Sequence, residues 1–347
     1  MKTIKDVPLE GKKVFLRADY NVPISNGEIA EDERIKESIK TIHHIFSNKP
    51  QLLLIVSHFS DQSQSMVPVA DKLQELLGVE VTLISDIQEL ANRTIFPSGK
   101  QEPEVLLMEN IRFWPEEEAG DEEFAKNFIQ DFDVYINDAF SVSHRDHASI
   151  SKMPKHVKEK CMGLLFEEEF SQLTKIKDNP DHPALAIIGG AKISTKLPVI
   201  NNLVKNYDRV LVGGMIANEA LDQGLVFDEK VMLPVDFGPE GLEESRLDIG
   251  PKTIELYKQE IAKAKTVMWN GPMGKFEEFD CDKGTRSMMQ AIAANTQAYR
   301  VVGGGETIEA MQRFGTFRDF NYVSMSGGAM LEFMAGNRLP GIEALEQ

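Results

Sequence analysis

Cysteine is nearly absent from this sequence, and so are long hydrophobic runs and an export signal. Cys161 and Cys281 are the only cysteines in 347 residues, which excludes a disulfide framework and favours a reducing compartment. The longest apolar runs, such as residues 52–56, are far shorter than the roughly 20 residues that span a bilayer. Residues 1–10 contain neither an apolar segment nor a cleavage pattern. We therefore expect a cytoplasmic protein with no membrane partner.

Positive charge is also in deficit. The chain has 38 Lys and Arg against 55 Asp and Glu, a formal net charge of −17. Such a field repels nucleic acid and anionic lipid, so we expect neither as a partner, and an anionic ligand would require a local basic cluster. At 347 residues the chain is too long for one ordinary core, which predicts two domains. Nothing in the sequence requires more than a monomer.

Short apolar runs alternate with helical patterns along the whole chain, which predicts parallel sheets covered by helices on both faces. The expected strands lie at residues 14–18, 52–56, 79–84, 104–108 and 134–136, and then at 184–188, 209–212, 231–235, 266–269, 300–302 and 322–324. About eleven strands fit two sheets of five or six better than one, because large twisted sheets tend to split. The predicted fold class is α/β with two doubly wound, Rossmann-like domains.

A helical pattern over residues 163–177, followed by the turn-rich segment 178–183, marks the seam between the halves. We predict an N-terminal domain over residues 1–160, an interdomain helix or hinge over 161–182, and a C-terminal domain over 183–334. A single helix between two domains would act as a stiff connector. Two acidic triplets are predicted to be solvated faces, at residues 116–118 and 167–169.

Polar residues follow the expected strands of the first half. Ligands bind beyond the carboxyl ends of strands in open α/β sheets, so these positions carry the functional information. They hold Arg17, Asp19, Asn21, Ser57, His58, Glu109, Asn110, Arg112, Asn137, Asp138, His144 and Arg145, and Arg34 follows the first loop. Each arginine alone is most simply a surface ion pair. Together at one sheet edge they predict a site for phosphate or carboxylate.

The second half has lysine and glycine at the corresponding positions. Residues 184–188 predict a strand that stops at Gly189 and Gly190, and a helical pattern begins near Ser194. Ser194 or Thr195 could cap this helix. Lys192 and Lys196 would lie on one side of this helix, where free N–H groups and the helix dipole also favour phosphate. The alternative is a tight turn with two solvated lysines.

Glycine recurs at the other strand ends of the second half. Glycine lets the backbone approach a ligand closely and lets N–H groups converge on an anion. A single glycine pair would be a routine turn, but five glycine-rich strand ends in one domain predict a nucleotide site. They lie at residues 189–190, 213–214, 270–274, 303–305 and 326–328, and a helix begins at the last of them.

Several familiar motifs are missing or incomplete. There is no P-loop, and the triplet His144, Arg145 and Asp146 lacks the asparagine of a protein-kinase catalytic loop. His144 and His147 could share a metal ion, but no third His or Cys ligand is evident. Gly303–Gly305 lack the spacing of a dinucleotide fingerprint, so an unrelated dinucleotide-dependent oxidoreductase is a weaker alternative.

Motifs along nearly the whole chain resemble those of the phosphoglycerate kinase family. In the first half they are Arg17-Ala-Asp19-Tyr-Asn21-Val-Pro23, Arg34-Ile, Val56-Ser-His58, Glu109-Asn-Ile-Arg112-Phe and Asn137-Asp-Ala-Phe-Ser-Val-Ser-His144-Arg145-Asp-His147-Ala-Ser. In the second half they are Gly189-Gly-Ala-Lys192-Ile-Ser-Thr-Lys196, Leu233-Pro-Val-Asp236, Asp248-Ile-Gly-Pro251, Trp269-Asn-Gly-Pro-Met-Gly-Lys-Phe-Glu277, Gly303–Thr307 and Leu339-Pro-Gly341. The resemblance implies two domains that face each other across a cleft, with a C-terminal tail at residues 335–347 packed on the first.

The resemblance also implies a reaction, the reversible transfer of a phosphoryl group between ATP and the carboxylate of 3-phosphoglycerate. The implied contacts of 3-phosphoglycerate are Asp19, Asn21, Arg34, His58, Arg112 and Arg145. The implied contacts of ADP or ATP are Lys196, Glu277, Gly303, Gly304, Gly305, Glu306 and Thr307. Arg34, Lys192 and the helix that begins at Gly327 would stabilise the group in transfer. The cofactor would be Mg²⁺, or alternatively Mn²⁺, with Glu306 as its protein ligand.

Several positions depart from the family pattern. Asp61 stands where a substrate arginine is usual, Glu306 replaces an aspartate, and Met325 replaces a threonine. Lys275 replaces a small apolar residue, and the chain is shorter than the family after residues 215 and 237. A divergent but working kinase is the leading hypothesis. The alternative is a weakened paralogue that binds phosphoglycerate without efficient transfer.

Overall fold

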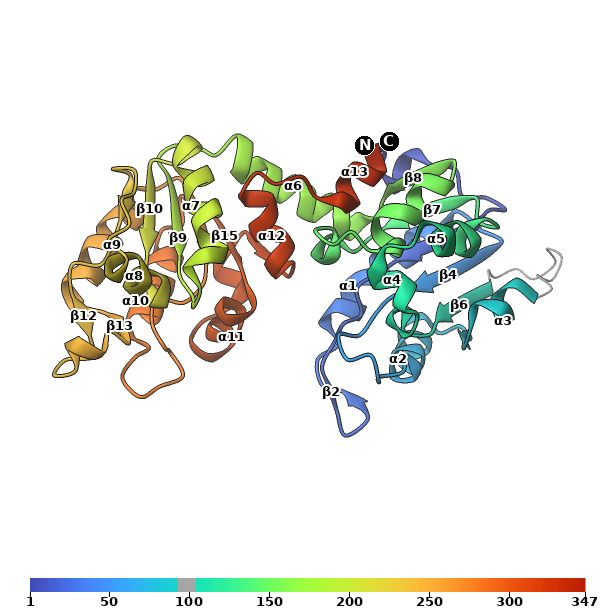
Figure 1. Cartoon of the computed structure of the whole chain (residues 1–347), viewed down its shortest axis with the longest axis horizontal. Coiled ribbons are helices and arrows are strands. Elements are labelled where there is room, and N and C mark those ends of the chain that lie inside the picture. Colours follow the sequence, from blue (N-terminus) through green and yellow to red (C-terminus); the bar gives the residue numbers. More distant parts are fainter. Residues whose placement is uncertain (93–103, 347) are drawn as a thin grey trace. The chain divides into compact units, whose positions relative to one another are not determined.

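The chain forms two compact units (Figure 1). The structure is a computed structural model that describes residues 1–92 and 104–346, so Gln347 of the predicted tail lies outside the described residues. Unit 1 comprises Met1–Phe170 and Arg338–Gln347, and unit 2 comprises Ser171–Asn337. The division between the units falls within α6 (Leu164–Asp178).

Unit 1 is built on six parallel strands in the order β5-β6-β4-β1-β7-β8. The strands are β1 (Lys13–Arg17), β4 (Leu52–Val56), β5 (Val81–Ile84), β6 (Glu104–Met108), β7 (Val134–Asn137) and β8 (Glu159–Met162). Five of them lie where apolar runs predict strands. No apolar run predicts β8, because this edge strand begins with the two charged residues Glu159 and Lys160.

Helices cover both faces of this sheet. Side chains alternate along a strand, and Val14 of β1 packs with apolar residues of α1 (Glu33–Ser47) and α2 (Val67–Leu77). Phe15 points the other way and packs edge-on against Phe128, with ring centroids 6.0 Å apart. The other elements of unit 1 are α3 (Ile87–Asn92), α4 (Pro115–Ala119), α5 (Glu122–Ile129), α13 (Pro340–Glu346) and the antiparallel pair β2 (Ile24–Ser25) and β3 (Glu28–Ile29).

Unit 2 repeats this plan with six parallel strands in the order β11-β10-β9-β14-β15-β16. The strands are β9 (Ala184–Ile188), β10 (Arg209–Val212), β11 (Val231–Met232), β14 (Thr266–Asn270), β15 (Tyr299–Gly303) and β16 (Tyr322–Ser324). All six were expected from the sequence. The strand β11 is shorter than predicted, since Pro234 cannot donate a hydrogen bond to a sheet ladder.

The core of unit 2 is centred on Trp269, which is fully buried. It packs in one cluster with side chains from α9 (Pro251–Lys263), α10 (Lys283–Ala294) and α11 (Gly305–Phe314). Unit 2 also contains α7 (Ile193–Asn206), α8 (Gly214–Asp222) and α12 (Gly327–Met334), and β12 (Phe237–Gly238) pairs with β13 (Asp248–Ile249). Two doubly wound parallel sheets confirm the predicted fold class.

The loop after β7 holds the start of α6 and the C-terminal helix α13 in place within unit 1. Asp138 Oδ1 accepts a hydrogen bond of 2.9 Å from the N–H of Leu165 and so caps α6. The N–H of Gly341 in α13 donates to the Ser143 carbonyl at 2.9 Å. Every helix within residues 1–92 and 104–346 is too short or too polar to cross a membrane.

Candidate functional site

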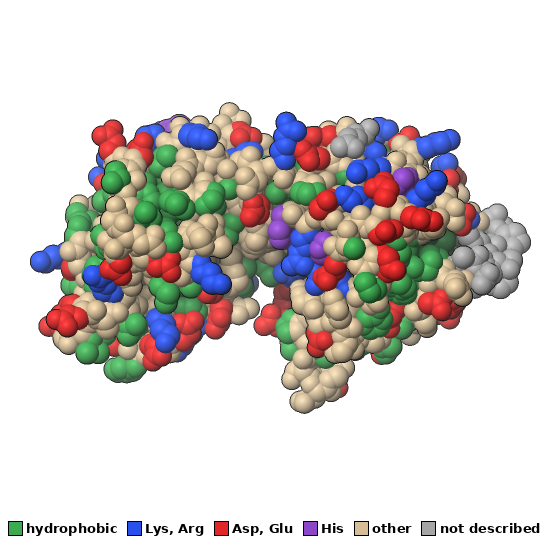
Figure 2. Space-filling model, viewed as in Figure 1, with side chains coloured by type: hydrophobic (Ala, Val, Ile, Leu, Met, Phe, Trp, Pro, Cys, Tyr) green, Lys and Arg blue, Asp and Glu red, His purple; other side chains and the backbone are tan. Residues whose placement is uncertain are grey.

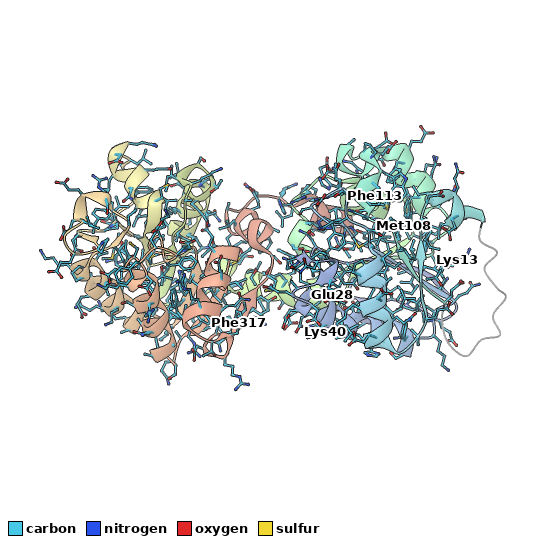
Figure 3. The ribbon with its side chains drawn as sticks, turned by 90° about the horizontal axis from the view of Figure 1, so that it is seen from below. Lys13, Glu28, Lys40, Met108, Phe113 and Phe317 are labelled. Atoms are coloured by element: carbon cyan, nitrogen blue, oxygen red, sulfur yellow. The ribbon has the colours of Figure 1, made fainter. Side chains whose placement is uncertain are left out.

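The sheet of unit 1 brings the predicted basic residues to one edge. Strands β6, β4, β1 and β7 are neighbours and run in parallel, so their carboxyl ends lie side by side. Figure 3 labels Met108 at the carboxyl end of β6 and Lys13 at the opposite, amino end of β1. The loops at the carboxyl edge carry Asp19, Asn21, His58, Arg112 and Arg145, and Arg34 extends from α1 to Asp19. Figure 2 shows Lys, Arg and His side chains gathered on the surface of this unit.

Arg17 and His58 form the buried base of this edge. The guanidinium of Arg17 is buried, and its Nε donates to Ser149 Oγ at 2.8 Å. Its NH2 lies 3.3 Å from Nδ1 of His58. Because a guanidinium can only donate, Nδ1 accepts and Nε2 carries the ring proton. Burial, and then the charge of Arg17, hold the pKa of His58 well below its usual value, so His58 is a neutral ring with one N–H to offer a ligand.

The basic groups at this edge repel one another. Burial, followed by the nearby charge of Arg145, lowers the pKa of Arg112. Burial, followed by Arg112 and Arg145, lowers the pKa of His147 to about 4. Within the described residues the guanidinium of Arg145 makes no hydrogen bond or ion pair. An anion placed here would relieve this repulsion, which is the electrostatic signature of an anion site.

Asp19 holds Arg34 at the rim of the same edge. Its carboxylate accepts hydrogen bonds from Arg34 and from the Ser141 hydroxyl, and at 3.0 Å from the N–H of Asn21. Burial would raise the pKa of Asp19, but the charge of Arg34 and the hydrogen bonds from Ser141 and Asn21 outweigh it and hold this pKa below its usual value. The Asn21 amide exchanges two hydrogen bonds of 2.9 Å with Ser60. Asp19 and Asn21 therefore act within the protein on the loops that carry the basic groups.

The acidic triplet at residues 116–118 contradicts the predicted solvated face. Glu117 is fully buried and accepts hydrogen bonds from Ser149 Oγ at 2.6 Å and Ser149 N–H at 2.7 Å. Ser149 Oγ thus bridges Glu117 to Arg17. Glu118 lies 3.2 Å from Nε of Arg112. These carboxylates orient the arginines, and the sequence gives little sign of it because Ser149 and Arg17 are distant along the chain. The second triplet is also not fully solvated, since Glu169 is buried.

The loop that departs from the family pattern contributes no charge to the basic edge. Asp61 accepts hydrogen bonds from the N–H of Ser63 at 2.8 Å and from its hydroxyl at 2.7 Å. Asp61 is therefore used in a local turn. The next residue, Gln62, donates to Glu118 at 3.0 Å. The loop thus reaches Arg112 indirectly, through the carboxylate that pairs with it.

In unit 2 the predicted cap of the lysine-bearing helix is wrong. The helix α7 begins at Ile193 with Lys192 as its N-cap residue, and neither Ser194 nor Thr195 caps it. The Thr195 hydroxyl instead donates to the Lys192 carbonyl at 2.9 Å. The N–H of Ile193 donates to Glu219 Oε2 at 2.9 Å. The cap therefore comes from α8, a separate helix, which local sequence rules do not consider.

The two lysines of this helix have different surroundings. Lys192 is exposed, and its ammonium makes no ion pair within the described part of the chain. Lys196 is buried and donates to Asn270 Oδ1 at the end of β14. Burial lowers the pKa of Lys196 to about 8, although the nearby Glu306 opposes this shift. The alternative of a tight turn with two solvated lysines is therefore wrong, because Lys196 is buried.

Asn270 lies in one of the predicted glycine-rich loops, but no role for its side chain is predicted from the sequence. Its side chain is 1% exposed, and Nδ2 has no hydrogen-bond partner in residues 1–92 and 104–346. A buried amide without a partner is destabilising. Its position beside the backbone of Gly304 and the ammonium of Lys196 makes it a donor for a ligand. The sequence feature that could have indicated this role is the polar side chain of Asn270 at the end of an apolar run, which forms the central strand β14.

Some of the predicted glycines serve loop packing instead of an open cradle. The N–H of Gly189 donates to the Asn270 carbonyl at 2.9 Å, and that of Gly190 donates to the Pro272 carbonyl at 3.1 Å. A Cβ on Gly189 would overlap the Pro272 carbonyl, and one on Gly213 would lie 2.6 Å from Met273 Sδ. These glycines let the loops lock together. In contrast, a Cβ on Gly305 or Gly327 would meet nothing within 4 Å among the described residues.

The remaining predicted residues of unit 2 are distributed along the same loops. Thr307 uses its hydroxyl within the protein, since Oγ1 accepts from the Gly271 N–H at 2.7 Å. Glu277 and Met325 are exposed. Glu306 Oε2 and Lys196 Cε lie 3.5 Å and 3.8 Å from the point that a Cβ on Gly190 would occupy. Because Gly190 has no side chain, there is space beside it between the Glu306 carboxylate and the Lys196 side chain.

The donor set of unit 2 fits a magnesium ion that is shared with phosphate. The described residues contain no group of three His, Cys, Asp or Glu that could hold a metal ion by themselves. Mg²⁺ is commonly bound by one or two carboxylates together with substrate phosphates and water. A single carboxylate, Glu306, beside a site for phosphate matches that mode of binding.

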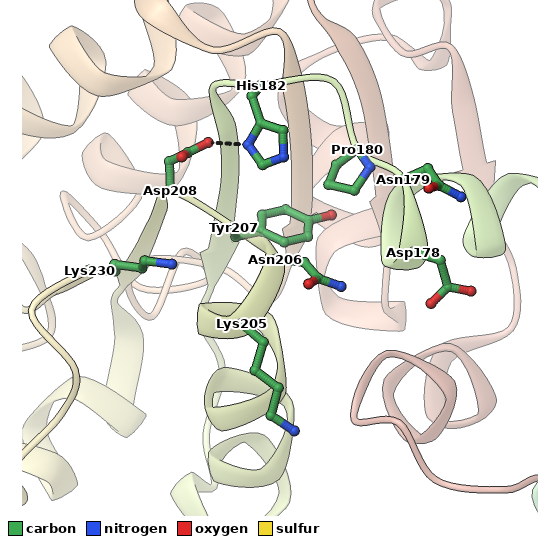
Figure 4. A pocket seen from close by; sticks show the side chains of 9 residues that line it. All are labelled: Asp178, Asn179, Pro180, His182, Lys205, Asn206, Tyr207, Asp208 and Lys230. Atoms are coloured by element: carbon green, nitrogen blue, oxygen red, sulfur yellow. Dashed lines mark hydrogen bonds and ion pairs between the residues drawn. The ribbon is translucent and has the colours of Figure 1, made fainter.

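A separate hollow of about 410 Å³ lies at the other edge of the unit 2 sheet, before β9 and β10 (Figure 4). Its wall includes His182 and Asp208, whose side chains are joined by a hydrogen bond of 2.7 Å. The Lys230 ammonium donates to the Val204 carbonyl at 2.7 Å. None of the predicted site residues lines it.

Comparison with known proteins gives a consistent result. The family model described as phosphoglycerate kinase matches residues 4–232 and 228–337. The phosphoglycerate kinase of Dictyoglomus turgidum is 38% identical over 391 residues, which cover 99% of this chain and 98% of that protein. The one from Anaeromyxobacter dehalogenans is 38% identical and covers 100% of both. The solved phosphoglycerate kinase from Coxiella burnetii has a TM-score of 0.87 at 33% identity, over 99% of this chain and 98% of that one.

Two doubly wound units, one with an arginine-rich edge and one with lysine and glycine loops, define a phosphotransferase with two substrates. The chain belongs to the phosphoglycerate kinase family, because the family model and the relatives match nearly its whole length. The predicted family, fold class and enzyme class are thereby confirmed.

Proposed function

We propose that the chain catalyses the reversible transfer of a phosphoryl group between ATP and the carboxylate of 3-phosphoglycerate. The observation that carries this proposal is the mutual repulsion of the basic groups at the carboxyl edge of the unit 1 sheet. In addition, the Arg145 guanidinium has no hydrogen-bond or ion-pair partner in the described residues. A doubly charged phosphate and a carboxylate would neutralise these groups. A second site, around Lys196 in unit 2, offers donors of a different kind for a second anion.

The proposed 3-phosphoglycerate site consists of residues with distinct tasks. Arg112 and Arg145 would hold the anionic groups as forks. His58 would donate its Nε2 proton, because Arg17 occupies Nδ1. Arg34 would face the reacting carboxylate, while Asp19 and Asn21 would orient the loops through the hydrogen bonds described above.

The proposed nucleotide site lies on the loops that follow β9, β14 and β15. Lys196 and the Asn270 amide would contact the phosphates, together with the backbone of Gly303, Gly304 and Gly305. Thr307 would support the site by holding the Gly271 loop. Glu277 would reach the ribose from its exposed position. Mg²⁺, or Mn²⁺ as the alternative, would neutralise phosphate charge when bound, and Glu306 would be its protein ligand.

The acceptor carboxylate is already ionised at neutral pH, so the reaction requires no general base. The chain would accelerate transfer by positioning the reactants and by stabilising charge on the phosphoryl group. Lys192 is suited to this because its ammonium is not tied to a carboxylate in the described structure. Arg34 and the N-terminus of α12 at Gly327 would supply further positive charge.

Two substrates that bind to different domains can react only when the sites meet, so we propose a hinge-bending cycle that also excludes water. In this scheme residues 1–160 and 183–334 are the moving domains, and 161–182 is the hinge. We propose that the protein acts as a cytoplasmic monomer on small-molecule substrates.

Release of ADP from ATP tests the proposed function, with and without 3-phosphoglycerate, in Mg²⁺ and in Mn²⁺. We expect turnover only with the acceptor. Absence of acceptor-dependent turnover with either metal would refute the proposal. Calorimetry separates a weakened paralogue from a working kinase, since the paralogue would bind 3-phosphoglycerate without binding nucleotide.

A further inference from the structure

The amino end of α7 is occupied by a carboxylate from a neighbouring helix. The first N–H groups of a helix have no partner within the helix and carry its positive dipole end. Here the N–H of Ile193, the first residue of α7, donates to Glu219 Oε2 of α8 at 2.9 Å. The hydroxyls of Ser194 and Thr195, which are closer along the chain, do not take this role.

Glu219 is fixed in this position by the backbone. The N–H of Gly214, where α8 begins, donates to the Met273 carbonyl at 2.8 Å. The N–H of Ile216 donates to the Gly190 carbonyl at 3.2 Å. Residue 219 lies three positions after Ile216 and so on the same face of the helix. The contact between Glu219 and Ile193 therefore follows from how the glycine loops lock α8 against α7.

This end of α7 also carries the groups that would receive phosphate. Lys192 is the N-cap residue, and Lys196 lies within the second turn of the helix. Lys196 donates to Asn270, whose Nδ2 is buried and without a partner in the described residues. A buried donor without a partner is an observation independent of the helix end, and it too favours an anion.

We propose that Glu219 competes with the nucleotide phosphates for the amino end of α7 and so weakens nucleotide binding. The inference rests on the proposed nucleotide site. In the free protein, Glu219 satisfies the Ile193 amide and cancels part of the local positive charge. A bound phosphate must share this end with Glu219 or displace it, and the two negative charges repel each other. Glu219 thus sets how tightly ADP and ATP are held without contacting the reacting atoms.

Glu219→Gln is the direct test, because glutamine keeps an oxygen that can accept from Ile193 but removes the charge. We expect the dissociation constant of ADP, measured by calorimetry at fixed Mg²⁺ and ionic strength, to fall about threefold to tenfold. Adenosine has no phosphate, so its binding should not change. Glu229→Gln removes the same charge from an exposed position of unit 2 and should leave ADP binding unchanged.

The possible results separate this inference from the proposed function. If the unmodified protein does not bind ADP, the proposed nucleotide site is wrong. If it binds ADP and Glu219→Gln binds no more tightly, Glu219 is only a structural cap and the inference is overturned. Equal tightening of ADP and adenosine would also overturn it. Glu219→Ala, which removes cap and charge together, should tighten ADP binding too and serves if the glutamine variant does not fold.

Discussion

The two candidate sites balance charge in opposite ways. At the basic edge of unit 1, burial and then the charge of Arg145 lower the pKa of Arg112, and burial followed by Arg112 and Arg145 lowers the pKa of His147. In unit 2, Lys196 has Asn270 and Glu306 as neighbours, and Glu219 caps the helix that carries it. The site in unit 1 therefore has an excess of positive charge before any ligand binds. In the site of unit 2, neighbouring carboxylates and an amide oxygen offset much of the positive charge.

This difference follows from the residue types. Arginine remains charged when it is crowded and offers a rigid fork, so several can be held together by a few buried carboxylates. Lysine loses its proton more easily when buried, and backbone N–H groups carry only partial charge. A site made of lysine and glycine is therefore easily balanced by single carboxylates. We expect unit 1 to bind its anion with little rearrangement and unit 2 to exchange internal contacts for ligand contacts.

The largest expected effect concerns Lys192, which lacks an ion pair in the described structure. Lys192→Ala should lower kcat by about 10²–10³-fold, since it removes a charge that acts on the group in transfer. The ADP dissociation constant should change by less than about threefold. Lys196→Ala should do the reverse and weaken ADP binding about tenfold, because its ammonium is positioned for the nucleotide phosphates. Steady-state kinetics and calorimetry measure the two quantities.

Lys258→Ala is the matched control for both lysine variants, because Lys258 is an exposed lysine on α9. Its kcat and ADP affinity should remain those of the unmodified protein. If Lys192→Ala and Lys196→Ala change kcat and ADP affinity in the same proportion, the two lysines do not have separate tasks.

The next effect concerns the buried carboxylate behind the basic edge. Glu117→Ala should lower the free energy of unfolding by about 3 kcal/mol, because Ser149 loses its hydrogen-bond acceptor and the buried charge of Arg17 loses a nearby carboxylate. Urea denaturation measures this change. Glu116→Ala in the same helix, where residue 116 is exposed, should have little effect. Equal stability of both variants would mean that Glu117 does not hold Arg17.

Much of the fold could be predicted because buried parallel strands produce continuous apolar runs. Eleven of the twelve strands in the two main sheets coincide with such runs, and β8 does not because it begins with two charged residues. The basic edge was predictable too, since residues that follow neighbouring parallel strands meet at one edge. These inferences need only local sequence and the geometry of a sheet.

Contacts between distant segments could not be predicted in the same way. Glu117 has the appearance of a surface glutamate until Ser149 and Arg17 are seen beside it. Glu219 caps a helix 26 residues away in sequence, whereas capping rules consider only adjacent residues. The glycines at 189 and 213 suggested an open cradle, but they are required where loops pack against each other.

A smaller effect should appear in the pH dependence of nucleotide binding. The pKa of Lys196 is about 8, so its ammonium loses its proton as the pH rises through this value. Phosphate binds the protonated form, and ADP binding should therefore weaken about threefold to tenfold between pH 7 and pH 9.5. Binding of 3-phosphoglycerate should change less, because arginine keeps its charge over this range. Calorimetry at each pH measures both ligands.

Lys196→Ala is the control for this profile, since the variant has no ammonium to titrate at that position. Its ADP affinity should be low and nearly independent of pH from 7 to 9.5. If ADP binding by Lys196→Ala depends on pH as strongly as in the unmodified protein, another group causes this dependence. The expected difference between the lysine site and the arginine site would then be wrong.

The smallest expected effect concerns Gln62, which contacts the basic edge through the carboxylate of Glu118. Gln62 donates to Glu118 at 3.0 Å, and Glu118 pairs with Arg112. Both Gln62 and Glu118 are on the surface, where a single contact contributes about 0.5 kcal/mol. Gln62→Ala should therefore raise KM for 3-phosphoglycerate by about twofold and leave KM for ATP unchanged. A change in KM for ATP alone would contradict the assignment of this loop to the basic edge.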